Sequence, residues 1–255
     1  INIMDLIFTN FFYVFLISII FNLILIKFKF FNINNYNNQV QDLHMNNPSR
    51  LGGVVIFITF FCYDIFIIGN INTFFWCASI IFAMAVFEDL KISIKPVIRL
   101  CIILISCFIL ISSFSVLPKF DVGPINFLLN NIIFQKIFFT LALATLINGQ
   151  NIIDGTNGLS SITGICIFIS ILFIGFKVND FYIINTSILI IILLLGFFIL
   201  NYPFGKLFLG DAGSYFIGIL SGYSVIYLFA NYQELPVLLA AIILFYPTTE
   251  VLFSY

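Results

Sequence analysis

The sequence predicts an all-α integral membrane protein, a polytopic bundle of about nine transmembrane helices. Hydrophobic residues make up 62% of the 255-residue chain and charged residues only 8%, which leaves too little polar surface to cover a water-soluble domain. The apolar residues are gathered in runs, and a helix needs about 20 such residues to cross a bilayer. A net charge of −1 and the lack of a basic run in the sequence argue against nucleic acid as a partner.

The predicted spans follow one another along the whole chain with only short polar segments between them. They are residues 6–26, 51–68, 71–87, 97–117, 132–147, 159–176, 181–200, 214–230 and 236–253. No internal repeat or linker is visible, so residues 1–255 are predicted to form one transmembrane domain. The five cysteines all lie in apolar runs without paired spacing, which predicts packed, reduced thiols rather than a zinc site.

Basic residues are distributed unevenly between alternate loops and span edges. One set holds Lys27, Lys29, Arg50, Lys91, Lys95, Arg99 and Lys206, and the opposite set holds Lys119, Lys136 and Lys177. The positive-inside rule places the richer set in the cytoplasm and the N-terminus outside. Four acidic residues also fall on the predicted cytoplasmic side, each at the end of a span: Glu88, Asp89, Asp154 and Asp211. Acids at several helix ends on this side suggest a metal and phosphate site facing the cytoplasm.

The segment 148–159 is the centre of this predicted site. Asn148, Asn151 and Asp154 recur in steps of three, which on a helix places them on one broad face. Asp154 could bind a metal, and the amide of Asn151 can both donate and accept. The turn 155–158 then leads into the next helix, whose free N–H groups would attract phosphate. The alternative is an ordinary helix C-terminus with Asn, Asp and Gly as cap residues.

A second candidate site is the acidic pair Glu88 and Asp89, at the end of the third span. Adjacent carboxylates suit a divalent cation, or a base acting on an acidic group. Lys91 follows closely and could neutralise phosphate. Solvation of an ordinary loop is the alternative, although charges are scarce in this chain.

A third candidate lies before the second span, where Arg50 stands beside Gly52 and Gly53, with His44 upstream. The glycines allow backbones to approach closely. The guanidinium group of Arg50 could pair with a phosphate, or it could anchor the span at the membrane surface. His44, the chain's only histidine, could equally be a plain loop residue.

The fourth candidate is the segment 208–214, before the eighth span. Asp211 lies between Gly210 and Gly213, and Ser214 follows one turn later. This pattern suits Mg²⁺, which prefers one or two carboxylates together with substrate phosphates and water. The alternative is that Asp211 is simply the N-cap of a transmembrane helix.

These four motifs together resemble the polyprenyl-phosphate N-acetylhexosamine-1-phosphate transferase family, in motif order and over essentially the whole chain. That family includes the undecaprenyl-phosphate N-acetylglucosamine-1-phosphate transferases and phospho-N-acetylmuramoyl-pentapeptide transferase. The Asn-x-x-Asn-x-x-Asp-Gly-x-x-Gly-Leu pattern is present at 148–159, Gly-Asp-x-Gly-Ser at 210–214, and Arg-x-Gly-Gly at 50–53. Glu88 replaces the more usual first Asp of the acidic pair. The family's later histidine-rich loop is absent, so the chain looks truncated at its C-terminus relative to the family.

The resemblance implies transfer of a sugar-1-phosphate from a UDP-N-acetylhexosamine to undecaprenyl phosphate, with release of UMP, in the bacterial inner membrane. It implies Mg²⁺, or Mn²⁺, held by Asp211 with Asp154. The implied catalytic residues are Glu88, Asp89, Lys91 and Asp154, and the implied substrate-binding residues are His44, Arg50, Asn148, Asn151, Gly210 and Ser214. Asp89 would deprotonate the lipid phosphate or act as a nucleophile. Membrane lipid would surround the protein, and a homodimer is left open.

Two features favour an N-acetylglucosamine-type enzyme of O-antigen or other surface-polysaccharide synthesis: Thr156-Asn157 in the central turn, and Ser-Arg-Leu-Gly-Gly at 49–53. Phospho-N-acetylmuramoyl-pentapeptide transferase is the alternative. A secondary transporter is more remote, because it predicts two related halves and charged groups near the bilayer midplane. A non-catalytic membrane scaffold is a further alternative. The candidate acid inside a span is Asp64, close to the outer end of its helix, and we expect its carboxylate to extend to the membrane surface.

Overall fold

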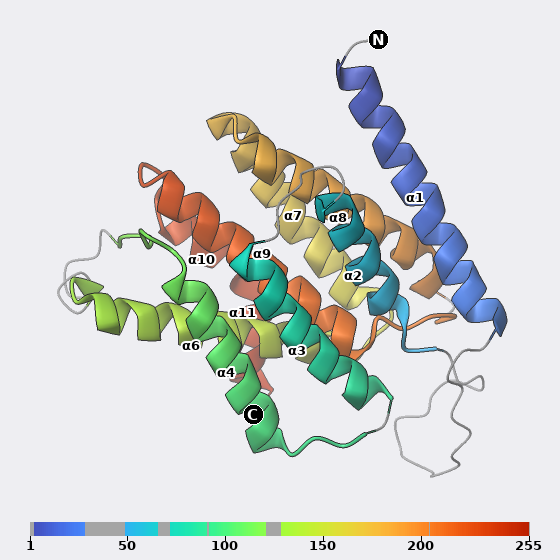
Figure 1. Ribbon diagram of the computed structural model, residues 1–255, viewed down its shortest axis with the longest axis horizontal. Helices are drawn as coiled ribbons and strands as arrows, with labels where there is room; N and C mark the ends of the chain where they lie inside the picture. Colours follow the sequence, from blue (N-terminus) through green and yellow to red (C-terminus); the bar gives the residue numbers. More distant parts are fainter. Residues whose placement is uncertain are drawn as a thin grey trace.

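A computed structural model describes residues 3–28, 49–65, 72–90, 92–120, 129–203 and 205–254. Its described part is helical and contains no named strand (Figure 1). The helices are α1 (Ile3–Phe28), α2 (Gly52–Tyr63), α3 (Thr73–Asp89), α4 (Pro96–Ser112), α6 (Ile132–Ile153), α7 (Leu159–Val178), α8 (Phe181–Asn201), α9 (Gly210–Asn231), α10 (Leu238–Ile243) and α11 (Phe245–Phe253). The predicted all-α membrane bundle is confirmed.

Among the described residues, α6, α7, α8 and α9 are long and apolar enough to cross a membrane. The predicted count of nine spans is not confirmed. The predicted span 236–253 is not one helix, since α10 ends at Ile243 and α11 begins at Phe245. Pro247 accounts for this break, because its ring lacks an N–H and would clash with the carbonyl group of residue 243.

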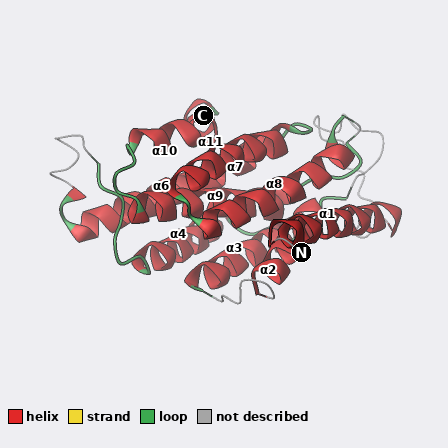
Figure 2. Ribbon diagram, turned by 90° about the horizontal axis from the view of Figure 1, so that it is seen from above, coloured by secondary structure: helices red, strands yellow, loops and turns green. Residues whose placement is uncertain are grey.

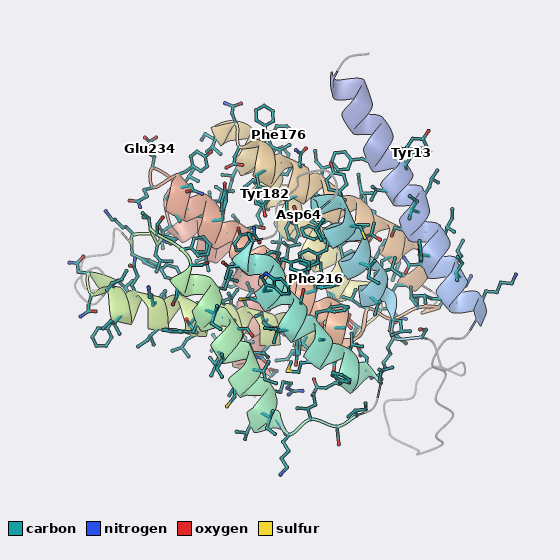
Figure 3. The ribbon with its side chains drawn as sticks, in the orientation of Figure 1. Tyr13, Asp64, Phe176, Tyr182, Phe216 and Glu234 are labelled. Atoms are coloured by element: carbon teal, nitrogen blue, oxygen red, sulfur yellow. The ribbon has the colours of Figure 1, made fainter. Side chains whose placement is uncertain are left out.

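Helix α9 is the centre of the bundle, and most of its residues are buried. It packs against α2, α3, α6 and α7, and Figure 2 shows it enclosed by the other helices. Phe216 on α9 contacts Phe57 and Phe60 of α2, with ring centroids 5.1 and 5.4 Å away, and it lies in the interior in Figure 3. By contrast, Tyr13 of α1 and Phe176 of α7 are exposed on the outside, as expected for lipid-facing side chains.

Small residues let the neighbouring helices approach α9 closely. A Cβ atom added at Gly53 would collide with the backbone of Gly213, and one added at Gly222 would collide with Leu143. The predicted close approach of backbones at the Gly52–Gly53 pair is therefore confirmed. Such small-residue contacts are typical of helix association in membranes, where dispersion packing replaces the hydrophobic effect.

Helix starts are stabilised differently at the two ends of the bundle. At one end, three helix starts are capped by the side chain of their own N-cap residue: Asn72 for α3, Asn131 for α6 and Asp180 for α8. At the other end, α2, α4, α7 and α9 begin without a side-chain cap of their own. The four predicted site segments lie at this second end, which we call the site end. Figure 1 shows that α1 begins at the N-terminus, away from the site end, and that its other end lies near the start of α2.

Asp64 follows α2 at the end opposite the site end, and its exposed fraction is only 3%. The expectation that its carboxylate reaches the membrane surface is wrong. The side chain instead interacts electrostatically with Tyr182 of α8 and Tyr223 of α9, and Figure 3 shows Asp64 and Tyr182 in the same part of the interior. The five cysteines are free, as predicted, but Cys62, Cys101 and Cys166 are exposed rather than packed.

The contact between α2 and α9 yields a first testable prediction. Gly53→Ala should lower the free energy of unfolding by about 1–3 kcal/mol, because the new methyl group forces two backbones apart. Thermal unfolding of the detergent-purified protein measures this loss. Gly155→Ala is the matched control, since the nearest atom to its added Cβ would be 3.6 Å away. Equal melting temperatures for the two variants would contradict this account of the packing.

Candidate active site at the converging helix ends

Backbone pairing joins the segment before α2 to the segment before α9. Ser49 and Leu207 form an isolated parallel bridge, and the Phe208 N–H donates to the Ser49 carbonyl at 2.8 Å. The N–H groups of Gly52 and Gly53 donate to the Phe208 and Leu209 carbonyls at 3.0 and 2.8 Å. The start of α2 is thus satisfied by backbone carbonyls of another segment, and Arg50 is held beside the start of α9.

Asp89, the last residue of α3, binds the start of α9. Its two carboxylate oxygens accept hydrogen bonds from the N–H groups of Asp211 and Ala212, each at 2.9 Å. The side-chain N-cap expected as an alternative role for Asp211 is therefore absent. The N-cap position belongs to Leu209, and Asp211 lies in the first turn of α9. Among the described residues, the Asp211 carboxylate accepts no hydrogen bond.

The end of α6 contributes Asn151 and Asp154. The hydroxyl of Ser214 donates to the Asn151 side-chain oxygen at 2.7 Å, and the Asn151 amide approaches the Tyr215 hydroxyl at 3.5 Å. Asp154 is the C-cap of α6. The alternative prediction, that this motif forms the C-terminus of a helix, is therefore confirmed for the position of Asp154. Asn148, in contrast, donates to the Ala144 carbonyl of its own helix at 2.8 Å, and its described hydrogen bond does not reach the other site residues.

Electrostatics couple the three aspartates. Partial burial raises the pKa of Asp154 well above its ordinary value, and the negative charges of Asp211 and Asp89 raise it further. Arg50 and a hydrogen bond from the Gly210 backbone act in the opposite direction on that pKa. Three carboxylates from three helix ends are therefore electrostatically coupled, with the guanidinium groups of Arg50 and Arg99 close enough to act on them, and a bound cation would relieve their repulsion.

The two remaining predicted residues, His44 and Lys91, lie outside the described residues. Glu88 forms an ion pair with Arg99 at the start of α4, with 3.3 Å between Oε1 and Nη1. Its other oxygen, Oε2, is buried and has no hydrogen-bond partner in the described part of the chain. Arg99 also interacts electrostatically with Asp211 and Tyr215. It was predicted only as a topology-setting basic residue, because nothing local to residue 99 indicates contact with residue 88 or 211.

Asn201, the last residue of α8, is a second residue that the sequence motifs did not indicate. Its side-chain oxygen accepts from the Gly158 N–H at 2.6 Å, and its amide donates to the Leu207 carbonyl at 2.7 Å. Gly158 has a φ of 81°, a conformation that favours glycine. Buried Asn201 therefore fixes the turn after α6 to the segment before α9.

The oxygen ligands at this end fit a magnesium site only in part. Carboxylates of Asp211 and Asp154 have the chemistry that Mg²⁺ prefers. Within the described ranges, however, no three His, Cys, Asp or Glu residues are arranged as a metal-binding group. Mg²⁺ commonly takes one or two carboxylates and completes its shell with substrate phosphates and water, so two aspartates are compatible with a site completed by a nucleotide.

Comparison with known proteins identifies the family. The sequence profile described as glycosyl transferase family 4 matches residues 71–229, more than half of the chain. The chain belongs to glycosyl transferase family 4. The matched range contains the acidic pair, the 148–159 motif and the start of α9, so the converging helix ends lie largely inside the family's sequence.

Individual members of glycosyl transferase family 4 are similar to parts of the chain. A Sulfolobus acidocaldarius protein, provisionally named UDP-N-acetylglucosamine–dolichyl-phosphate N-acetylglucosaminephosphotransferase, is 34% identical over 103 residues, covering 40% of this chain and 30% of its own length. The phospho-N-acetylmuramoyl-pentapeptide-transferase of Streptococcus sanguinis is 34% identical over 121 residues, covering 47% and 36%. The chain thus spans about a third of the length of these relatives.

The double hydrogen bond of Asn201 yields a second prediction. Asn201→Ala leaves a buried N–H and a buried carbonyl unpaired, which should cost about 1–3 kcal/mol of unfolding free energy. Thermal unfolding in detergent measures the loss. Ser170→Ala is the matched control, because the Ser170 hydroxyl donates only to the carbonyl of Cys166 on its own helix. A wild-type melting temperature for Asn201→Ala would refute this role for Asn201.

Proposed function

We propose that this chain carries the catalytic core of a membrane enzyme that transfers a sugar-1-phosphate from a UDP-N-acetylhexosamine to undecaprenyl phosphate. The observation that supports it most directly is the meeting of Asp89, Asp154 and Asp211, from three helix ends, beside Arg50. Family membership supports the same class of reaction. The sugar we favour is N-acetylglucosamine, for the start of surface-polysaccharide synthesis.

The reaction would be a displacement at the β-phosphorus of the UDP-sugar. An oxygen of the acceptor phosphate forms the new P–O bond, and the bond to the UMP oxygen breaks, so that UMP leaves and a polyprenyl diphosphate-sugar remains. Negative charge grows on the leaving phosphate, and fixed cations stabilise it. Arg50 and Arg99 would supply this stabilisation from the protein side.

The carboxylates would divide the remaining tasks. Asp211 and Asp154 would hold Mg²⁺, or Mn²⁺, which supplies electrophilic stabilisation of the diphosphate when bound. The proton of the acceptor phosphate would pass to the acidic pair, where Glu88 has an oxygen that no described residue contacts by a hydrogen bond. Asn151, held by Ser214, would orient the nucleotide. Lys91 and His44 remain predicted contributors to phosphate binding.

The distribution of basic residues supports placing the site end at the cytoplasmic face of the bacterial inner membrane, with the N-terminus outside. The UDP-sugar would then arrive from the cytoplasm and the lipid phosphate from the membrane. Similarity to the Streptococcus sanguinis protein supports the alternative that the donor carries N-acetylmuramoyl-pentapeptide.

The third prediction tests the activity. The full-length gene product, purified in detergent, should release UMP when it is mixed with Mg²⁺, undecaprenyl phosphate and UDP-N-acetylglucosamine. Activity with UDP-N-acetylmuramoyl-pentapeptide alone would select the alternative donor. No UMP from either donor, under conditions in which a known relative works, would reject the proposed function.

The fourth prediction tests the aspartates. Asp211→Asn and Asp154→Asn should each reduce turnover at least about 100-fold, because each removes a negative charge that would hold the Mg²⁺ on the diphosphate. Their melting temperatures should stay near that of the wild type. Glu234→Gln is the matched control, since Glu234 is an exposed carboxylate remote from the site end, and it should keep full activity. Retained turnover in both aspartate variants would remove this site assignment.

A further inference from the structure

Asp89 makes contacts that differ from those of its neighbour Glu88. Both oxygens of Asp89 accept backbone N–H groups of α9 at 2.9 Å. Glu88 pairs with Arg99 through one oxygen, and its other oxygen has no hydrogen-bond partner among the residues that the structure describes. The two members of the acidic pair are thus directed at different elements, and only Asp89 is engaged by the start of α9.

The start of α9 needs a partner from elsewhere. The first N–H groups of a helix have no acceptor within the helix, and Leu209 at the N-cap has no side chain that could accept them. Gly210 has a φ of 77°, and a Cβ atom there would collide with the Arg50 carbonyl and lie 2.7 Å from Asp89 Oδ2. Asp89 therefore does for α9 what an N-cap residue ordinarily does, with a negative charge that also suits the helix dipole.

This contact determines the place of Asp211. Asp89 holds the backbone N–H of Asp211 itself, while the Asp211 carboxylate accepts no hydrogen bond from the described residues. The first turn is fixed on its other side by Ser214, whose hydroxyl contacts both Asn151 and the Asp211 carbonyl. The N-terminal turn of α9 is thus fixed from α3 and from α6, and Asp211 projects from between these two attachments.

We propose that Asp89 is a positioning residue, which caps α9 from α3 and thereby aims Asp211, rather than the group that takes the acceptor's proton. The hydrogen bonds between Asp89 and α9 are present in the structure whatever reaction the protein catalyses. Their effect on turnover rests on the proposed function. If Asp89 were the proton acceptor, its replacement would lower the turnover number at any Mg²⁺ concentration. As a positioning residue, Asp89 instead fixes the orientation of Asp211, so its replacement would weaken the binding of Mg²⁺ by the Asp211 carboxylate.

Hydrogen–deuterium exchange of the ligand-free protein tests the cap without any assay of activity. Asp89→Asn keeps one acceptor oxygen and Asp89→Ala keeps none, so exchange at 209–214 should accelerate in that order, by at least about tenfold in the alanine variant. Glu88→Gln is the matched control and should leave exchange at 209–214 unchanged. Exchange in α7 reports on whether the whole protein is folded. If α7 also exchanges quickly in Asp89→Ala, that variant is unfolded, and the result for Asp89→Asn decides whether the cap exists. Wild-type exchange at 209–214 in Asp89→Asn would overturn the proposal.

Kinetics then separate positioning from proton transfer. In Asp89→Asn, the apparent KM for Mg²⁺ should rise about tenfold, and most of the turnover number should return at saturating Mg²⁺. A turnover number that stays low at all Mg²⁺ concentrations, with an unchanged KM for Mg²⁺, would return the proton-acceptor role to Asp89 and overturn the proposal. If accelerated exchange accompanies a wild-type protein that releases no UMP from any donor, the cap stands and the proposed function fails.

Discussion

The unsatisfied N–H groups of helix starts are the constraint on which the site end depends. Where these helix starts pack against other segments, water is displaced, so the protein itself must supply acceptors for the N–H groups. At the opposite end, asparagine or aspartate at the N-cap does this locally for α3, α6 and α8. At the site end, the acceptors come from other segments: backbone carbonyls for α2, the Asn201 side chain for the turn before α7, and the Asp89 carboxylate for α9. Each such bond joins parts of the chain that are far apart in sequence.

The same bonds explain how carboxylates come to lie together despite their repulsion. Two backbone N–H donors stabilise the negative charge of Asp89. Arg50 and the Gly210 backbone stabilise the negative charge of Asp154. Asp211 is the carboxylate that the described residues leave without a hydrogen-bond donor. Helix packing brings the aspartates near one another, and backbone donors decide which of them is available to a ligand.

The sequence was sufficient to predict the membrane bundle, because hydrophobic run length is a local property with a strong physical cause. Sequence motifs also indicated which helix ends carry acids, amides and glycines. The partners of those residues could not be predicted. Asn201, Arg99 and the capping role of Asp89 depend on contacts across long stretches of chain, for which a single sequence holds no local signal. The break between α10 and α11 was missed although Pro247 indicates it, since the surrounding residues are uniformly apolar.

The interior position of α9 has a consequence for how the protein is made. Its glycines and serines face neighbouring helices rather than lipid, so this helix gains less from the bilayer alone than α7 or α8 does. The helices against which it packs most extensively, namely α2, α3, α6 and α7, precede it in the chain. During synthesis α9 therefore emerges after these partner helices have entered the membrane. Their surfaces are then available to pack against α9 and keep it in the bundle.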